Sequence, residues 1–163
     1  MLKETKPLTE LQLVLFELAS EHYAVDSSNV REVMRMQNIT RVPGAPPFVK
    51  GVINLRGRVV PVLDLGKRLG LPGGEHGKDA RIVVVEVGGQ SVGMVVDGVS
   101  EVLRIPLSII EPPSSLVTPD DLNYVIGVAK LENELVILLD LDKLLNVSEK
   151  RTLSGGGRGD SQN

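Results

Sequence analysis

Residues 48–70 read FVKGVINLRGRVVPVLDLGKRLG, and residues 124–146 read YVIGVAKLENELVILLDLDKLLN. Aligned at an offset of 76 residues, the two stretches are identical at ten positions. Upstream of each, VREVMRM at 30–36 matches VSEVLRI at 99–105 at an offset of 69. The chain is therefore built from two related halves, and this duplication constrains the fold more than any single motif does.

The positions that the two repeats share describe a common framework, and the positions that differ describe what one repeat does alone. Gly51 and Asp64 recur as Gly127 and Asp140. The stretch NLRGR at 54–58, by contrast, becomes KLENE in the second repeat. We therefore look for structure in the first set of residues and for function in the second.

The repeats also divide the chain. Each half is too small to bury much surface by itself, so we expect the halves to pack on each other as one domain. The seam between them is polar and rich in glycine, and the C-terminal tail offers no core residues and is expected to be disordered. The predicted boundaries are an N-terminal tail at 1–10, repeat halves at about 11–70 and 81–147 within one domain at 11–147, a seam at 71–80, and a C-terminal tail at 148–163.

Short apolar runs rich in Val, Leu and Ile alternate with turn residues, which predicts a mainly β fold. We expect two small antiparallel barrels, related by pseudo-symmetry, that share a central apolar interface with a groove along its rim. The expected strands lie at 11–18, 22–25, 39–42, 49–55, 59–63, 81–87 and 90–96, with a further hairpin at 124–141.

Three short helices are expected between these strands. Residues 26–29 (DSSN) offer N-cap side chains, and the spacing of Val30, Val33 and Met34 predicts a short helix after them. The other two helices would follow a strand in each repeat, at 64–69 and 140–145.

Composition excludes several classes of function. The 163 residues carry a net charge of -3 with no basic block, so a nucleic-acid surface is not expected. The chain has no cysteine, which removes disulfides, thiolate metal sites and cysteine nucleophiles. It has no long apolar run and does not begin like a signal peptide, so we expect a cytosolic protein without membrane insertion.

No arrangement of residues typical of catalysis is visible. Asp64 and Asp140 each follow a strand and begin a helix, where a carboxylate caps free backbone N–H groups, so we interpret both as structural. His22 and His76 lack the spacing of a metal pair, and no Gly-Lys-Ser/Thr follows the glycine-rich seam. The sequence therefore predicts a protein that is not an enzyme and that holds no metal or cofactor.

The remaining candidate for a functional site is the basic hairpin of the first repeat. A solvated, charged turn is the ordinary interpretation of such residues. The second repeat replaces the arginines with Glu132 and Glu134, however, and Glu32 is expected close enough to pair with Arg56 and hold its guanidinium for a partner. The charged residues considered are Lys50, Asn54, Arg56 and Arg58 of the hairpin, with Glu32 and Arg35 on the preceding expected helix.

The stretch PPFVKGVINLRGRVVPVLDL at 46–65, supported by VGMVVDGVSEVL at 92–103, resembles the chemotaxis coupling protein family, CheW. The resemblance extends over about 11–147. It implies two five-stranded SH3-like barrels and a non-enzymatic adaptor. Such an adaptor links the cytoplasmic tip of methyl-accepting chemoreceptors to the regulatory domain of the histidine kinase CheA. A cytoplasmic location at membrane receptor arrays would follow.

The resemblance also implies where the partners bind. The kinase is expected at barrel-end surfaces of both halves. The receptor-binding groove would be formed by Val30, Glu32, Val33, Lys50, Gly51, Arg56 and Val102. Apart from the resemblance, the divergence of the basic hairpin predicts that Asn54 and Arg58 contact a partner.

Two other functions stay open at this point. The first is a small β-barrel enzyme or ligand-binding protein, with a ligand held between the halves. The second is a fragment of a larger protein, either the kinase regulatory domain itself or the first half of a fusion between a coupling protein and a receiver. Turnover of a metabolite would support the enzyme, against which the missing catalytic residues argue.

Overall fold

A computed structural model describes residues 9–73, 76–113 and 124–145. The predictions for the C-terminal tail and for most of the N-terminal tail lie outside these residues. None of the helices in the described part of the chain is long and apolar enough to cross a membrane.

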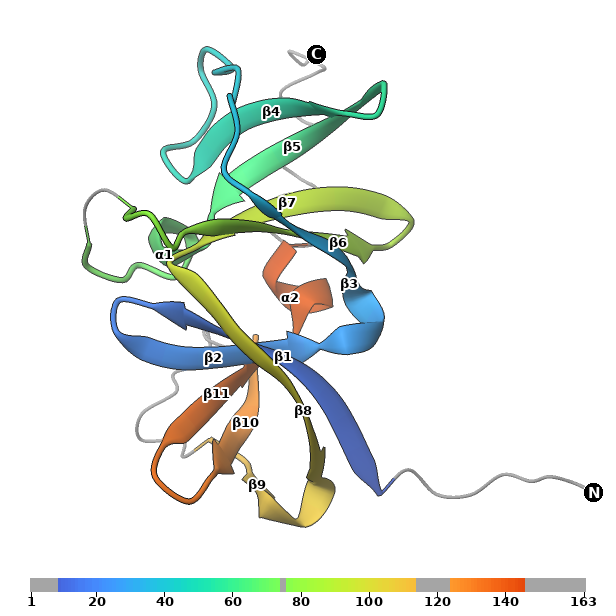
Figure 1. Cartoon of the computed structure of the whole chain (residues 1–163), viewed down its shortest axis with the longest axis vertical. Helices are drawn as coiled ribbons and strands as arrows, with labels where there is room; N and C mark the ends of the chain where they lie inside the picture. Colours follow the sequence, from blue (N-terminus) through green and yellow to red (C-terminus); the bar gives the residue numbers. More distant parts are fainter. Residues whose placement is uncertain (1–8, 74–75, 114–123, 146–163) are drawn as a thin grey trace, which may run out of the picture.

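Strands dominate the described residues, and the helices between them are short (Figure 1). The strands are β1 (Glu10–Leu18), β2 (Glu21–Asp26), β3 (Val30–Arg35), β4 (Val49–Leu55), β5 (Arg58–Asp64), β6 (Arg81–Val87), β7 (Gln90–Val96), β8 (Gly98–Pro106), β9 (Ile110–Glu111), β10 (Val125–Lys130) and β11 (Leu135–Leu139). The helices are α1 (Leu65–Arg68) and α2 (Leu141–Leu145), with 3₁₀ turns at Ser27–Asn29 and Leu107–Ile109.

The strands form two sheets that occupy the two ends of the molecule (Figure 1). The first barrel has the strand order β3-β6-β7-β5-β4, and the second barrel has the order β8-β1-β2-β11-β10-β9. In the second barrel, β8 runs through a 3₁₀ turn directly into β9, so the first and last strands of the sheet are consecutive in the chain. In the first barrel, Thr40 follows β3 and pairs with Val52 of β4, which closes that sheet in the same way. The prediction of two small barrels is confirmed, with β9 as an additional short strand in the second.

The barrels do not coincide with the sequence repeats, because each barrel combines strands from both halves. The β1–β2 hairpin of the first repeat belongs to the second barrel, and the β6–β7 hairpin of the second repeat belongs to the first. Parallel pairing of β2 with β11 and of β7 with β5 joins each hairpin to the other repeat. Sequence patterns predict strands but not which of two equivalent edges a hairpin joins. Neither repeat can therefore form its barrel alone.

Strand register confirms the pseudo-symmetry. Val62 pairs with Gly93 in the first barrel, and Leu138 pairs with Ala24 in the second. These residues correspond at the offsets of 76 and 69 that align the repeats, so the same pairing occurs twice.

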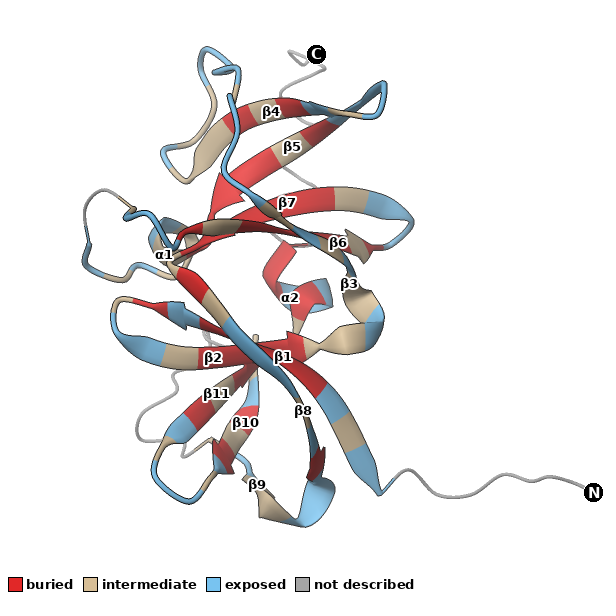
Figure 2. Ribbon diagram, in the orientation of Figure 1, coloured by how far each residue is buried: buried red, intermediate tan, exposed pale blue. Residues whose placement is uncertain are grey.

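The two barrels share an apolar core, as the sequence predicts (Figure 2). The central cluster joins Phe16 and Tyr23 of the second barrel to Met94 of the first and Leu144 of α2. The rings of Phe16 and Tyr23 stack with their centroids 6.4 Å apart. A smaller separate cluster fills each barrel. Burial of this continuous core supplies the main force that holds the barrels together.

The expected helix after residues 26–29 is wrong, because Val30–Arg35 is strand β3. Its residues alternate between half-buried and exposed, and it pairs with β6. The spacing of Val30, Val33 and Met34 fits a helix equally well, but a strand over these residues pairs with β6 in the sheet. The expected cap at Asp26 does form, since Oδ1 accepts a hydrogen bond from the backbone N–H of Ser28, but it caps only a 3₁₀ turn.

Arg68 of α1 lies where equivalent parts of the two repeats meet. Its guanidinium is 5.7 Å from the ring centroids of both Phe48 and Tyr124, which are equivalent positions of the repeats. Its Nη2 donates a hydrogen bond of 3.0 Å to the carbonyl of Leu144, the residue equivalent to Arg68 itself. Cation–π contacts of this kind add polar ties to the apolar interface.

Candidate binding face

The basic hairpin is a tight two-residue turn between β4 and β5. Arg56 and Gly57 have φ angles of 52° and 85°, as a type I′ turn requires. The side-chain Oδ1 of Asn54 accepts a hydrogen bond of 2.8 Å from the backbone N–H of Gly57. Asn54 therefore stabilises the turn, and Arg56 and Arg58 are left exposed on the surface.

Arg56 donates a hydrogen bond from Nη2 to the Oε2 of Glu32, and the two side chains form an ion pair. The hydrogen bond, and then the charge of Glu32, raises the pKa of Arg56 above its ordinary value. The predicted pair is confirmed, although Glu32 lies on strand β3 and not on a helix. Because β3 and β4 are the two end strands of the sheet, this pair spans the closure of the first barrel.

A polar pocket of about 310 Å³ lies beside this pair. A second ion pair borders it, with Nε of Arg31 2.7 Å from Oε1 of Glu86. Arg58 also lines the pocket, and among the described residues no ion pair is found for it. The face thus carries one cation more than its anions can neutralise. The lining residues are Arg31, Glu32, Leu55, Arg56, Arg58, Val60, Val84, Glu86 and Ser91.

The structure brings some of the predicted groove residues together and separates others. Val30, Glu32 and Val33 share strand β3, and Lys50 lies on β4 at the other end of the same sheet. Val102 lies on β8 in the second barrel. Val33 and Val102 are equivalent positions of the two repeats and are 42% and 58% exposed. Each barrel therefore presents one exposed valine at the same place, whereas Val30 packs against the shared core.

Gly51 has a structural role, so a glycine at this position is explained without any binding protein. Its φ is 146°, and a Cβ placed on it would lie 2.0 Å from the carbonyl oxygen of Thr40. Thr40 makes the backbone pairing with Val52 that closes the barrel. Gly127 repeats the arrangement, since its Cβ would lie 2.6 Å from the carbonyl oxygen of Glu111. A bulky substitution at Gly51 would therefore disturb the fold before it blocked a groove.

The second hairpin repeats the strand pairing of the first but differs in its turn and its charges, since neither Glu132 nor Asn133 has a positive φ. Lys130 Nζ lies 3.3 Å from Glu111 Oε2, and His22 Nδ1 lies 2.8 Å from Glu134 Oε1. Glu132 stands at the position of Arg56, and Glu101 at that of Glu32, so the ion pair of the first barrel cannot form here. The charged face, formed by Arg31, Arg56 and Arg58 with Glu32 and Glu86, therefore lies on the first barrel.

The capping role of the two aspartates is confirmed. Oδ1 of Asp64 accepts a hydrogen bond of 3.1 Å from the backbone N–H of Lys67, and Oδ1 of Asp140 accepts one of 3.2 Å from Lys143. Asp64 is also buried, which Asp140 is not.

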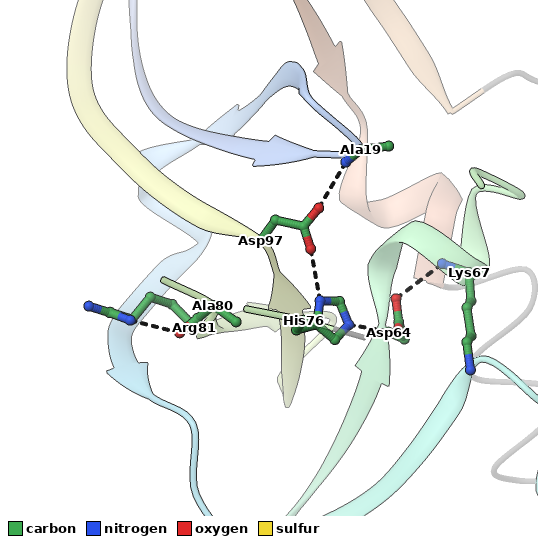
Figure 3. A network of polar contacts seen from close by, with 7 residues as sticks. All are labelled: Ala19, Asp64, Lys67, His76, Ala80, Arg81 and Asp97. Carbon is green, nitrogen blue, oxygen red and sulfur yellow. Dashed lines mark hydrogen bonds and ion pairs between the residues drawn. The ribbon is translucent and has the colours of Figure 1, made fainter. Parts of the chain in front are cut away.

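Sequence reasoning missed a polar network at the junction of the barrels (Figure 3). His76 lies between two carboxylates, with Nε2 2.8 Å from Oδ2 of Asp64 and Nδ1 2.8 Å from Oδ1 of Asp97. The other oxygen of Asp97 accepts a hydrogen bond of 2.8 Å from the backbone N–H of Ala19. These residues are far apart in sequence and share no motif, so no spacing could have pointed to the network.

An apolar pocket of about 660 Å³ lies beside the β10–β11 hairpin. Tyr23 and Tyr124 are among its lining residues, together with Leu69 and Leu71, which follow α1. Burial, followed by the charges of Glu21 and Tyr124, raises the pKa of Tyr23. Among the described residues, the lining contains no histidine or serine that could act as a base or nucleophile. In that part of the chain, no group of three or more His, Cys, Asp or Glu residues could hold a metal ion.

Comparison with known proteins gives consistent matches. A family model described as the CheW-like domain matches residues 12–149. Chemotaxis protein CheW of Thermotoga maritima is 37% identical over 140 residues, which cover 85% of this chain and 89% of that protein. Chemotaxis protein CheW of Bacillus subtilis is 35% identical over 135 residues, covering 83% of this chain and 86% of that protein.

A solved structure is similar to this chain in both fold and sequence. The scaffolding protein TtCheW from Thermoanaerobacter tengcongensis is 42% identical and superimposes with a TM-score of 0.78. The match covers 85% of this chain and 94% of that one. These relatives are named as chemotaxis and scaffolding proteins and not as enzymes.

Proposed function

The chain belongs to the CheW family of chemotaxis scaffold proteins, and we propose that it couples the cytoplasmic tips of methyl-accepting chemoreceptors to the histidine kinase CheA. In this role it acts in the cytoplasm, at receptor arrays on the membrane. It binds two proteins at once and changes neither covalently.

The observation that carries this proposal is the charged face of the first barrel. The Glu32–Arg56 pair fixes a guanidinium on a rigid turn, with Arg58 exposed beside it. A partner that meets preordered side chains loses less conformational entropy on binding than one that must order them. The equivalent face of the second barrel carries Glu132 and Glu134 in place of the arginines, which supports a role for one face that the fold itself does not need.

The receptor groove proposed here consists of Val30, Glu32, Val33, Lys50, Gly51, Arg56 and Val102, with Asn54 and Arg58 as hairpin contacts. The exposed Val33 and Val102 offer apolar contacts and the Glu32–Arg56 pair offers polar ones, a combination suited to a helical hairpin. Gly51 contributes by closing the barrel that holds the others in position.

The kinase regulatory domain is proposed to bind barrel-end surfaces of this chain. A body with two similar barrels offers two similar surfaces, so one adaptor can bridge two neighbours. A signal would then pass as a shift in how the receptor tip sits on the rigid body, which changes the population of active kinase.

The test is a binding titration of the purified chain against a receptor-tip fragment and the kinase regulatory domain, separately and together. We expect Arg56→Glu to weaken receptor-tip binding at least tenfold, which is about 1.4 kcal/mol, because it places two carboxylates side by side. The fold should persist, since an exposed ion pair contributes little to stability. Glu132→Arg, at the equivalent position of the second barrel, is the matched control and should leave receptor-tip binding unchanged.

The double variant Glu32→Arg/Arg56→Glu separates the ion pair from the positive charge. If the pair matters only because it orients the hairpin, the reversed pair restores binding. If Arg56 itself contacts the partner, binding stays weak. If Arg56→Glu binds each partner with the same affinity as the wild-type chain, this face is excluded as a binding site.

Ligand binding is a second candidate function, and the apolar pocket of about 660 Å³ favours it. Pockets of this size accept small molecules. Saturable binding of an apolar fluorophore that Leu135→Glu abolishes, without change in partner binding, would support a separate ligand site. No such effect is expected if the pocket serves only protein contacts.

A further inference from the structure

The polar pocket beside the Glu32–Arg56 pair is formed by two hairpins and one end strand of the first barrel. The β4–β5 and β6–β7 turns lie on the same side of this barrel (Figure 1). Arg56 and Arg58 reach the pocket from the first of these hairpins, and Glu86 and Ser91 reach it from the second. Strand β3 supplies the remaining charged side chains, Arg31 and Glu32.

Each glutamate of the pocket is held by its own arginine. Oε1 of Glu86 lies 2.7 Å from Nε of Arg31, and Oε2 of Glu32 accepts a hydrogen bond from Nη2 of Arg56. A guanidinium has five N–H groups, so neither ion pair uses all the donors of its arginine. The two pairs therefore position the sides of the pocket and leave it rich in hydrogen-bond donors.

Arg58 is the cation that remains after these pairs have formed. It is exposed at the start of β5, and no described carboxylate forms an ion pair with it. Ser91 lines the same pocket, and its hydroxyl has no hydrogen bond to any described residue. Two donors on neighbouring hairpins thus face one pocket without an acceptor from the described part of the chain.

In the second barrel, the side chains at the two equivalent positions bind each other. Glu134 stands at the position of Arg58, and His22 stands at the position of Ser91. Oε1 of Glu134 lies 2.8 Å from Nδ1 of His22, so side chains at these two positions are close enough to meet. The first barrel has two donors at the same place, and an acceptor group between them would bind both.

The two barrels carry opposite charge at the positions that form this pocket. Three arginines and two glutamates line it in the first barrel. The equivalent positions of the second barrel have no arginine and four glutamates, namely Glu17, Glu101, Glu132 and Glu134. Since the fold accepts both patterns, it does not need the positive one. An excess of one positive charge matches one carboxylate, whereas a phosphate group with a charge of about −1.5 to −2 would exceed it.

We propose that this pocket binds a single carboxylate, the side chain of an aspartate or glutamate on the receptor tip, an inference that rests on the coupling function proposed above. One carboxylate oxygen accepts from the guanidinium of Arg58, and the hydroxyl of Ser91 donates to the other. Hydrogen bonds between charged groups are directional, whereas apolar contacts are not. The acidic side chain therefore sets the position and orientation of the partner on the charged face.

Calorimetric titration of the full chain with a receptor-tip fragment gives the first test. Arg58→Gln removes the charge and keeps a polar side chain, and we expect it to weaken binding about tenfold. Ser91→Ala removes one neutral donor and should weaken binding less, by about threefold. Lys67→Gln is the matched control, because it removes the same charge from α1, beyond the far end of β5, and should leave binding unchanged. Unchanged affinity of Arg58→Gln would overturn the inference and leave the coupling function intact.

A double-mutant cycle identifies the carboxylate itself. Each aspartate and glutamate of the fragment is changed in turn to its amide. One of these changes should weaken binding to the wild-type chain about as much as Arg58→Gln does, and should have no further effect on binding to Arg58→Gln. If every amide change has the same effect on binding to both chains, Arg58 pairs with no single carboxylate and the inference is wrong. If the fragment does not bind the wild-type chain at all, the coupling function fails and this inference fails with it.

Inorganic phosphate distinguishes a partner's side chain from a free anion. Phosphate added at constant ionic strength should leave the affinity of the fragment for the wild-type chain unchanged. If phosphate displaces the fragment from the wild-type chain and not from Arg58→Gln, the pocket takes a free anion, and the inference is overturned.

Discussion

The β4–β5 and β10–β11 hairpins share a framework and differ in their turns and charges. Each has a glycine in its first strand that faces a backbone carbonyl of the closing segment, and each leads to an aspartate that caps a short helix. Only the first has a turn with positive φ angles, at Arg56 and Gly57. The first hairpin pairs Arg56 with Glu32, whereas the second has Glu132 opposite Glu101. The residues that close each barrel occur in both hairpins, whereas the charges of the turns do not.

The comparison also separates two kinds of residue that a single copy would not distinguish. A residue kept in both hairpins is explained by contacts within the barrel. Among the residues found in one hairpin only, Asn54 and Gly57 shape the turn itself, and the exposed arginines are the ones that need an explanation outside the barrel. Variants at equivalent positions of the two hairpins should therefore differ in their cost to stability.

Replacement of the two glycines by alanine should cost different amounts of stability. Gly51→Ala combines strain at a φ of 146° with a Cβ 2.0 Å from Thr40 O. We expect a loss of about 4 kcal/mol in the free energy of unfolding, from backbone strain and overpacking together. Gly127→Ala has only the overpacking, at 2.6 Å from Glu111 O, and should lose about 1–3 kcal/mol. Urea denaturation measures both, and equal losses would contradict the role of the φ angle.

The capping aspartates should differ in the same direction. Asp64→Ala removes a helix cap and the hydrogen bond to His76, for a loss of about 3 kcal/mol. Asp140→Ala removes a cap alone and should cost about 1 kcal/mol. Chemical denaturation at neutral pH compares the two variants. A larger loss at Asp140 would mean that the network around His76 contributes nothing to stability.

Tyr23 should make the β1–β2 hairpin sensitive to alkaline pH in a way that the β6–β7 hairpin, with Val92 at the equivalent position, is not. Burial raises the pKa of Tyr23 above its ordinary value of 10.0, so the folded chain holds this proton more tightly than the unfolded chain. The resulting stability is fully present below about pH 10 and is lost as pH rises further. Tyr23→Phe should therefore flatten the alkaline fall in melting temperature. Parallel curves for the two proteins would refute this.

Much of the fold could be predicted because the repeats show it twice. The Gly88-Gly89 turn and the β-branched runs around it predict β6 and β7 with the bounds that the structure has. The strand Val30–Arg35 was mistaken for a helix because its apolar spacing fits both structures, and only pairing with β6 decides between them. The exchange of hairpins between barrels could not be predicted, because it depends on which of two similar sheet edges a hairpin joins.

The charge pattern of the repeats predicted part of the candidate site. Contacts between residues distant in the sequence could not be predicted from it. Arg56 and Glu32 could be paired because one repeat keeps opposite charges at positions where the other has two carboxylates. His76 offered no such signal. Its partner Asp64 is the last residue of β5, and its partner Asp97 directly follows β7. The sequence of the seam shows no spacing that relates them.

The most direct test gives the first hairpin the charges of the second. Arg56→Glu/Arg58→Glu and the reciprocal Glu132→Arg/Glu134→Arg are compared with the wild-type chain by calorimetric titration with a receptor-tip fragment. We predict a loss of affinity of at least tenfold for the first variant, no loss for the second, and melting temperatures close to that of the wild type for both. Unchanged affinity in the first variant, or an equal loss in both, would contradict the claim that the diverged hairpin of the first repeat is the binding face.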